Sequence, residues 1–200
     1  VSLATPAFLI FMAVGMTFGV GGDSLISRML GEGTVEKAKH ISAFCCWTGV
    51  VIGVLAGIFM FLFAEPIGWK IGASELTIAY TCDYLRVVAV CIPFMIFSNM
   101  FSHIIRAEGQ ATVAMAGMVI GNLVNIVFDP IMILGFGWDV AGAAVATVLG
   151  NVFSTAFYLF HLLRKSNLLS VRVKDYMVGD QIASGVLFIG VPASLNNILM

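Results

Sequence analysis

Charged side chains are scarce in this sequence. Only 10% of the residues are charged and 60% are hydrophobic, whereas an ordinary soluble domain is about 25% charged. The mean hydropathy is +1.03 and the formal net charge is −1. The composition therefore excludes a soluble globular domain, and without an excess of basic residues we expect no nucleic-acid partner. It indicates an integral membrane protein of the cell membrane, with the lipid bilayer as its surroundings.

Motifs of enzymes and metal centres are also missing. The sequence contains no Cys-x-x-Cys pair, and its four cysteines lie in or beside apolar runs, where we expect small core residues. There is no His-Glu-x-x-His or Gly-x-Ser-x-Gly motif, and a single acid within a membrane segment cannot supply an acid–base pair. We therefore expect no enzyme, no metal centre and no cofactor. A membrane enzyme is kept only as the weakest alternative.

Six apolar segments have about the length that crosses a bilayer, which is roughly 20 residues. They cover residues 1–20, 41–64, 78–101, 111–134, 140–160 and 182–200. None shows the alternating pattern of a barrel strand, so we predict helices. The predicted fold class is an all-α integral membrane protein, a polytopic bundle with about six transmembrane helices here. No leader precedes Val1 and the last apolar run reaches Met200, so we expect an internal piece of a longer protein.

Basic residues are distributed unevenly between the predicted loops. Of the ten Lys and Arg, eight fall on one side: Arg28, Lys37, Lys39, Arg106, Arg164, Lys165, Arg172 and Lys174. Lys70 alone falls on the other side, and Arg86 lies within a segment. The positive-inside rule makes the richer side cytoplasmic, and Trp69 and Trp138 then lie on the outer side, as an aromatic belt requires.

Glycines recur at intervals of four residues in three of the segments. The pairs or triplets are Gly15 and Gly19; Gly49, Gly53 and Gly57; and Gly117 and Gly121. Small residues at this spacing let helices approach closely in lipid, so we expect helix contacts at these positions. Sixteen Phe and eleven Met could line an adaptable pocket for apolar cations, although most are expected to face lipid or core.

The fourth segment carries three polar residues on one stripe. Asn122, Asn125 and Asp129 are spaced by three and then four residues, which places them on one face of a helix. A carboxylate in a bilayer costs at least about 2.5–3.5 kcal/mol, so such groups usually face a cavity or a partner. Pro130 has no N–H, so the carbonyl of Ile126 loses its helical donor. The stripe therefore predicts a cation or proton site, with Asn122 in a supporting position.

Thr147 belongs to the same predicted site. The rise of 1.5 Å per residue puts Asp129 about 8 Å and Thr147 about 10 Å below the outer face, on antiparallel neighbouring helices. Oxygens of Asp129, Asn125 and Thr147 suit a hard cation such as sodium. The carboxylate could instead carry a proton, because burial favours the neutral form of a carboxyl group. The alternatives are a structural hydrogen bond for Asp129 and a bond to its own helix for Thr147.

Several motifs occur together in a particular order. Residues 27–33 read Ser-Arg-Met-Leu-Gly-Glu-Gly, and residues 106–110 read Arg-Ala-Glu-Gly-Gln. Gly121-Asn122 leads to Asp129-Pro130, then to Gly-Phe-Gly-Trp at 135–138 and Gly-Ala-Ala-Val-Ala-Thr at 142–147. In this order and spacing the motifs resemble the multidrug and toxic compound extrusion (MATE) transporters over nearly the whole chain.

The resemblance implies twelve helices in two lobes, of which this chain covers about helix two to part of helix seven. Residues 1–163 would be the amino-terminal lobe without its first helix, 164–181 a cytoplasmic linker, and 182–200 the start of the second lobe. The family exports organic cations and other drugs in exchange for sodium or protons. In similar members Asn125, Asp129 and Thr147 match the cation ligands, together with an Asp of the first helix. We expect a monomer.

A lipid-linked sugar flippase of the same superfamily is the main alternative function. Cationic side chains inside the cleft would favour it, and among the six segments only Arg86 is cationic. The expected function is therefore a secondary active multidrug exporter that works by alternating access.

The charge bias predicts the membrane topology. In a full-length protein whose native cysteines are all replaced, single cysteines are placed at Asn167 and Asp139. An impermeant thiol reagent outside intact cells should label only the Asp139 position, because residues 164–180 are expected to be cytoplasmic. Labelling at Asn167 would overturn the topology.

Overall fold

The structure is a computed structural model that describes residues 5–70, 75, 78–135, 139–176 and 180–199. Its elements are α1 (Thr5–Gly31), α2 (Val35–Leu62), α3 (Ala64–Lys70), α4 (Ile78–Ala107), α5 (Ala111–Pro130), the π-helical turn η2 (Ile131–Gly135), α6 (Asp139–Arg164), the 3-10 turn η3 (Val173–Asp175) and α7 (Asp180–Leu199). The described residues contain no strand, and the prediction of an all-α fold is confirmed.

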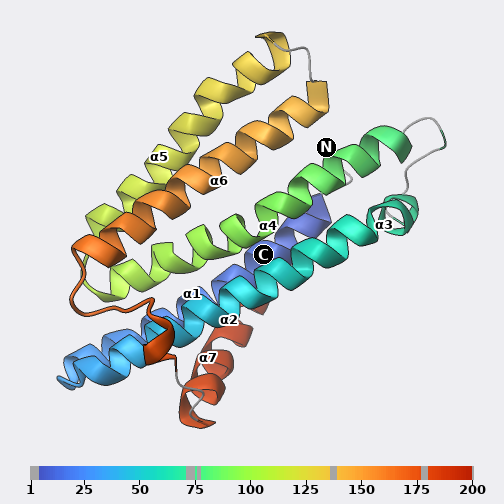
Figure 1. Cartoon of the computed structure of the whole chain (residues 1–200). Helices are drawn as coiled ribbons and strands as arrows, with labels where there is room; N and C mark the ends of the chain where they lie inside the picture. Colours follow the sequence, from blue (N-terminus) through green and yellow to red (C-terminus); the bar gives the residue numbers. More distant parts are fainter. Residues whose placement is uncertain (1–4, 71–74, 76–77, 136–138, 177–179, 200) are drawn as a thin grey trace.

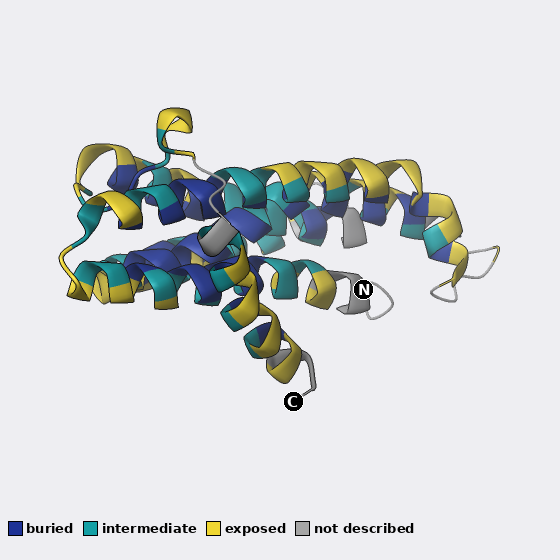
Figure 2. Cartoon of the chain, turned by 90° about the horizontal axis from the view of Figure 1, so that it is seen from below, coloured by how far each residue is buried: buried dark blue, intermediate teal, exposed yellow. Residues whose placement is uncertain are grey.

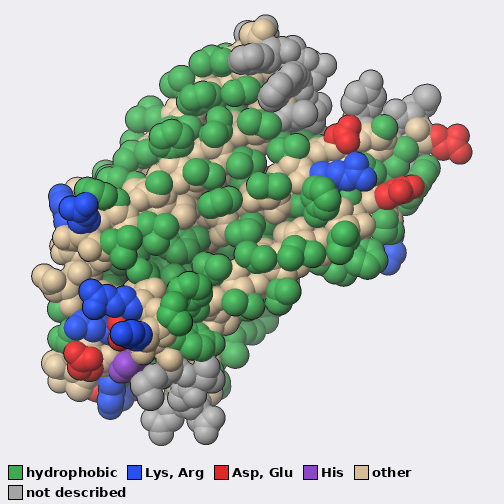
Figure 3. Space-filling view, viewed as in Figure 1, with side chains coloured by type: hydrophobic (Ala, Val, Ile, Leu, Met, Phe, Trp, Pro, Cys, Tyr) green, Lys and Arg blue, Asp and Glu red, His purple; other side chains and the backbone are tan. Residues whose placement is uncertain are grey.

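Membrane-length helices dominate the chain. Within the described residues, parts of α1, α2, α4, α5 and α6 are long and apolar enough to cross a bilayer, and the apolar part of α7, Ile182–Asn196, is shorter. Hydrophobic side chains cover most of the face in Figure 3, and charged side chains gather toward its two ends. Such an apolar belt between polar ends is what a bilayer requires of a spanning bundle. The protein is a multi-pass cell-membrane protein.

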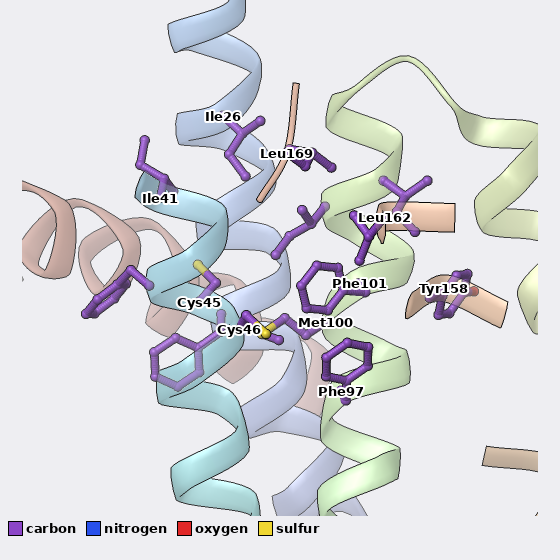
Figure 4. Packing of buried hydrophobic residues seen from close by; sticks show 14 of the residues in the cluster. Ile26, Ile41, Cys45, Cys46, Phe97, Met100, Phe101, Tyr158, Leu162 and Leu169 are labelled. Atoms are coloured by element: carbon purple, nitrogen blue, oxygen red, sulfur yellow. The ribbon is translucent and has the colours of Figure 1, made fainter. Parts of the chain in front are cut away.

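The helix α4 lies at the centre of the bundle. It packs against α1, α2 and α6, while α5 pairs with α6 and α7 packs against α1 (Figure 1). The buried residues lie on the facing sides of the helices and the exposed residues on the outer sides (Figure 2). The main core joins Ile26, Cys45, Met100, Phe101 and Tyr158, all fully buried (Figure 4).

The cysteines behave as the sequence predicted. Cys45, Cys46, Cys82 and Cys91 are all free and buried. Within the described residues, no group of three or more His, Cys, Asp or Glu side chains is placed to hold a metal ion.

Several helices extend beyond the apolar segments, so the predicted ends were wrong. The helix α1 continues to Gly31 and α4 to Ala107. Arg28, His103 and Arg106 therefore lie on helices instead of in loops. An apolar run marks only the part of a helix that lies in the hydrocarbon layer, which is about 30 Å thick. The 30 residues of α4 extend over about 45 Å at 1.5 Å per residue, so both the helix and its polar ends reach beyond that layer.

A glycine in the left-handed conformation ends each of these two helices. Gly33 has φ 77° and Gly109 has φ 83°. After α1 the N–H of Thr34 donates to Met29 O at 2.8 Å, and after α4 the N–H of Gln110 donates to Ile105 O at 3.2 Å. These bonds satisfy carbonyls that a helix end leaves free. The helices therefore stop at this hydrogen-bonded glycine turn and not where hydrophobicity falls.

The segment after α6 packs on α2. Ser42 Oγ accepts a hydrogen bond from the N–H of Ser170 at 2.9 Å, and Trp47 Nε1 donates to Val171 O at 3.2 Å. Phe44 and Tyr176 stack with 6.1 Å between ring centroids. The segment predicted as a linker is therefore held against α2, and Arg164 belongs to α6. The division into lobe, linker and second lobe stays a prediction.

The glycine ladders lie at helix contacts, as the spacing predicted. A Cβ added at Gly53 would lie 2.9 Å from Pro93 Cα, and one at Gly57 would lie 2.7 Å from Ala89 O. At Gly15 an added Cβ would lie 3.1 Å from Ile96 O. The backbones of α1 and α2 thus approach α4 so closely that a side chain does not fit.

This contact predicts the effect of enlarging Gly53. Gly53→Leu should push α2 away from α4, and overpacking of this kind typically costs about 1–3 kcal/mol. The yield and melting temperature of the purified full-length protein should both fall.

Gly31→Leu is the matched control, because an added Cβ at Gly31 meets no atom within 4 Å. If Gly53→Leu melts and expresses like Gly31→Leu, the close contact between α2 and α4 is wrong.

Candidate functional site

Asn125 lies between the other two predicted ligands. Its amide has two orientations, related by rotation about the last side-chain bond. In one, Nδ2 donates to Thr147 Oγ1 at 3.3 Å. In the other, Nδ2 donates to Asp129 Oδ2 and Oδ1 accepts from the N–H of Thr147, both at 3.2 Å. The structure therefore brings Asn125, Asp129 and Thr147 together across the pair α5 and α6.

Asp129 has one carboxylate oxygen without a partner. Its Oδ1 is buried and accepts no hydrogen bond from the described residues, while Oδ2 lies beside the Asn125 amide. A buried polar atom without a partner is costly, and native structures contain few of them. The free oxygen is therefore a position where a cation or a proton would be stabilised.

The backbone around Asp129 is irregular. The helix α5 runs through Asp129 and Pro130 and widens into the π-helical turn η2. Such turns are rare and often occur at functional sites. Pro130 has no backbone N–H and therefore makes no helical hydrogen bond of its own. The helix can widen at Pro130 because no N–H bond of this residue has to be broken.

Thr147 makes the predicted bond to its own helix and also lies next to the other two predicted ligands. Its Oγ1 donates to Ala143 O at 2.9 Å, one turn earlier on α6. The hydroxyl proton is thus used within the helix, as the structural alternative expects. The lone pairs of the same oxygen still face Asn125, and they can accept the Asn125 amide or bind a cation.

Asn122 lies apart from this cluster. It is exposed and makes no hydrogen bond with the part of the chain that is described. It faces a cavity that is bounded by α1, α4, α5 and α6. Its supporting role in cation binding stays a prediction, as do the roles of the three clustered residues.

The cavity has a volume of about 520 Å³, within the range of about 300–1,000 Å³ that is usual for small-molecule sites. Asn125 and Thr147 line it, whereas Asp129 is not among its lining residues. Four methionines from three helices form apolar walls: Met12, Met16, Met95 and Met118. The flexible thioethers of methionine adapt to ligands of different shape.

Two basic residues also line the cavity, which corrects an expectation. The sequence placed Arg106 in a loop and left Arg86 as the one cation within the segments. The structure puts His103 and Arg106 in the cavity wall. Arg86 instead pairs with Asp83 at 3.7 Å, and both side chains are largely exposed.

Comparisons with known proteins assign the family. The model of the MatE family matches residues 1–131, well over half of the chain. The chain belongs to the MatE family. The expectation that it is not an enzyme is confirmed by this membership.

The relatives of this MatE chain are named as exporters. The Multidrug export protein MepA of Staphylococcus aureus is 36% identical over 200 residues, which are 100% of this chain and 44% of MepA. A solved inward-facing conformation of a multidrug resistance MATE family transporter of the MOP superfamily is 30% identical with a TM-score of 0.90, over 96% of this chain and 44% of that chain. The outward-facing conformation of such a transporter is 31% identical with the same TM-score of 0.90, over 99% and 44%.

The chain thus spans less than half the length of the proteins that it matches. Its similarity to an inward-facing and an outward-facing structure is equally high. Within this MatE chain, the bundle described above is therefore compatible with both conformations.

The sequence analysis missed a second polar network. Asn151 Nδ2 donates to Thr147 O at 2.9 Å, and Ser98 Oγ on α4 donates to Asn151 Oδ1 at 3.0 Å. The network joins α4 to α6 beside the candidate ligands. The signal for it was present, since Thr147, Asn151, Ser154 and Tyr158 follow one another at intervals of three or four residues.

Asn151 should therefore stabilise the bundle. Asn151→Ala removes a donor and an acceptor from the α4–α6 contact and should lower the free energy of unfolding by about 1 kcal/mol. Thermal melting of the purified full-length protein measures the difference.

Asn122→Ala is the control in the same cavity, because Asn122 has no hydrogen-bond partner among the described residues and should change stability by less than about 0.5 kcal/mol. Equal melting of the two variants would contradict the network.

Proposed function

We propose that the full-length protein is a secondary active exporter of small amphipathic molecules, exchanged for Na⁺ or H⁺ by alternating access. The observation that carries the proposal is the buried Oδ1 of Asp129, which has no hydrogen-bond partner among the described residues and lies near a methionine-walled cavity. Family membership and relatives named as multidrug exporters support it.

The geometry offers three oxygen ligands. They are Asp129 Oδ1, Thr147 Oγ1 and, in one amide orientation, Asn125 Oδ1. Carboxylate, amide and hydroxyl oxygens suit a hard cation such as Na⁺. A proton on Asp129 would instead make the carboxyl group neutral and give it one O–H donor. The cost of a buried charge would then be removed.

Asn125 and Thr147 connect the ion to the transported molecule. Both belong to the Asp129 cluster and both line the cavity. A cation that draws their oxygens toward Asp129 changes the wall that a substrate contacts. Coupling requires that each ligand favour a different conformation, and two shared residues provide a physical link between the sites.

A lipid-linked sugar flippase is a second candidate function. The basic residues His103 and Arg106 in the cavity wall favour it, because such a substrate carries phosphate groups. The exporter is preferred, since the relatives reported above are named for drug export.

Neutralising Asp129 tests the exporter. Asp129→Asn keeps the shape but removes the charge that holds the ion, so ion-driven export of a fluorescent drug from loaded vesicles should be abolished. Thr147→Ala removes one neutral ligand and should lower the ion affinity by about tenfold at most. Stabilisation by Na⁺, or by a change of pH for a proton-coupled protein, should be lost in Asp129→Asn.

Asp83→Asn is the matched control, because Asp83 is largely exposed in an ion pair. Export by Asp129→Asn at the parental rate under the same gradient would contradict the proposal.

A further inference from the structure

The cavity has a basic end that the proposed ion site does not use. His103 and Arg106 come from the last two turns of α4 and line the cavity. Arg106 lies against Met118 of α5, and Met118 precedes Asn125 by seven residues. Along a helix this separation is about 10 Å. The basic end is therefore distinct from the cluster around Asp129.

Arg106 is an exposed residue that lines one end of the cavity. Its Nη2 lies 3.8 Å from Met118 Sδ of α5. A thioether is a weak acceptor, while a guanidinium has five N–H donors. Arg106 forms no ion pair with an acid of the described residues, so most of its donors are free for a ligand.

No acid of the described residues lines the cavity to balance this charge. Asp23 of α1 also lies outside the lining. This end of the cavity therefore attracts anions and repels cations.

We propose that His103 and Arg106 form a subsite for the anionic group of an amphipathic substrate, such as a carboxylate, sulfonate or phosphate. Arg106 binds the anion through its fork of N–H donors, a geometry that matches a carboxylate or phosphate. The apolar body of the substrate lies against the methionine walls. The subsite rests on the proposed export function and adds to it a preference for substrates that carry a negative group, including zwitterions.

A consequence is that ion and substrate do not share one charged group. The coupling ion binds at Asp129 and the substrate anion at Arg106, on opposite parts of the site. Exchange then depends on Asn125 and Thr147, which belong to both the cavity and the ion cluster.

Two dyes that differ in one group test the subsite. A zwitterionic rhodamine has a free benzoate, and its methyl ester is a cation with the same ring system. Binding of each dye to the purified full-length protein is measured by fluorescence anisotropy in phosphatidylcholine nanodiscs. Arg106→Gln should weaken binding of the benzoate dye about tenfold or more and leave binding of the ester within about twofold, because only the benzoate forms charge-assisted hydrogen bonds. Arg106→Lys keeps the charge and should retain part of the preference.

Arg28→Gln is the control variant, since Arg28 is an exposed arginine paired with Glu32 outside the cavity, and it should bind both dyes like the parent. An equal loss of both dyes in Arg106→Gln, or no loss of either, would overturn the subsite while leaving the exporter standing. Equal losses in Arg28→Gln and Arg106→Gln would also overturn it. If the parent protein bound neither dye, the proposed export function would fail together with the subsite.

A lipid phosphate has the same chemistry as a substrate anion, so the measurements are repeated with phosphatidylglycerol in the nanodiscs. A preference for the benzoate dye in both membranes supports a substrate subsite. Loss of the preference only with phosphatidylglycerol would assign the basic end to lipid head groups and overturn the proposal.

Discussion

Lipid offers no hydrogen bonds, so every polar group of a spanning helix must find its partner inside the protein. The pair α5 and α6 meets this constraint through close backbone approach. Tyr158 OH donates to Ala114 O and Ser154 Oγ donates to Gly117 O, both at 2.7 Å. The approach is possible because Gly117 and Gly121 have no side chain at the contact. Among the described residues, Asp129 Oδ1 is one of four buried side-chain atoms without a hydrogen-bond partner, with Thr48 Oγ1, Glu108 Oε2 and His161 Nε2.

The cavity and the neighbouring cluster of Asn125, Asp129 and Thr147 carry different charges at their two ends. Asp129 supplies a carboxylate at one end, and Arg106 supplies a guanidinium at the other. Between them, Ser98 donates to Asn151 across α4 and α6, and Asn125 bonds Thr147 across α5 and α6. A movement of α5 relative to α6 would therefore alter both ends, because Asn125 on α5 and Thr147 on α6 contact each other.

Much of this arrangement could be predicted from the sequence, for physical reasons that differ between elements. Uninterrupted apolar runs have few alternatives to a membrane helix, and glycines at four-residue spacing indicate a close contact. The stripe of Asn125 and Asp129 could be found because helical spacing alone puts them together. The ends of α1 and α4 could not be found from hydropathy, since the bonds around Gly33 and Gly109 set them.

The direction of Arg106 depends on a different helix. A basic residue at a helix end can extend toward the membrane surface or lie along a neighbouring helix, and Arg106 contacts Met118 of α5. Sequence spacing within α4 contains no information about that neighbour. The same holds for the packing of Ser170 on α2, which joins residues that are 128 positions apart.

The attachment of the segment after α6 has a mechanical meaning. Ser42, Trp47 and His40 of α2 hold it through backbone atoms of Ser170, Val171 and Asp175. The part of this segment held on α2 reaches Tyr176, only four positions before α7 begins at Asp180. A large displacement of α7 would break its packing on α1, and it would either move α2 as well or detach this segment from α2.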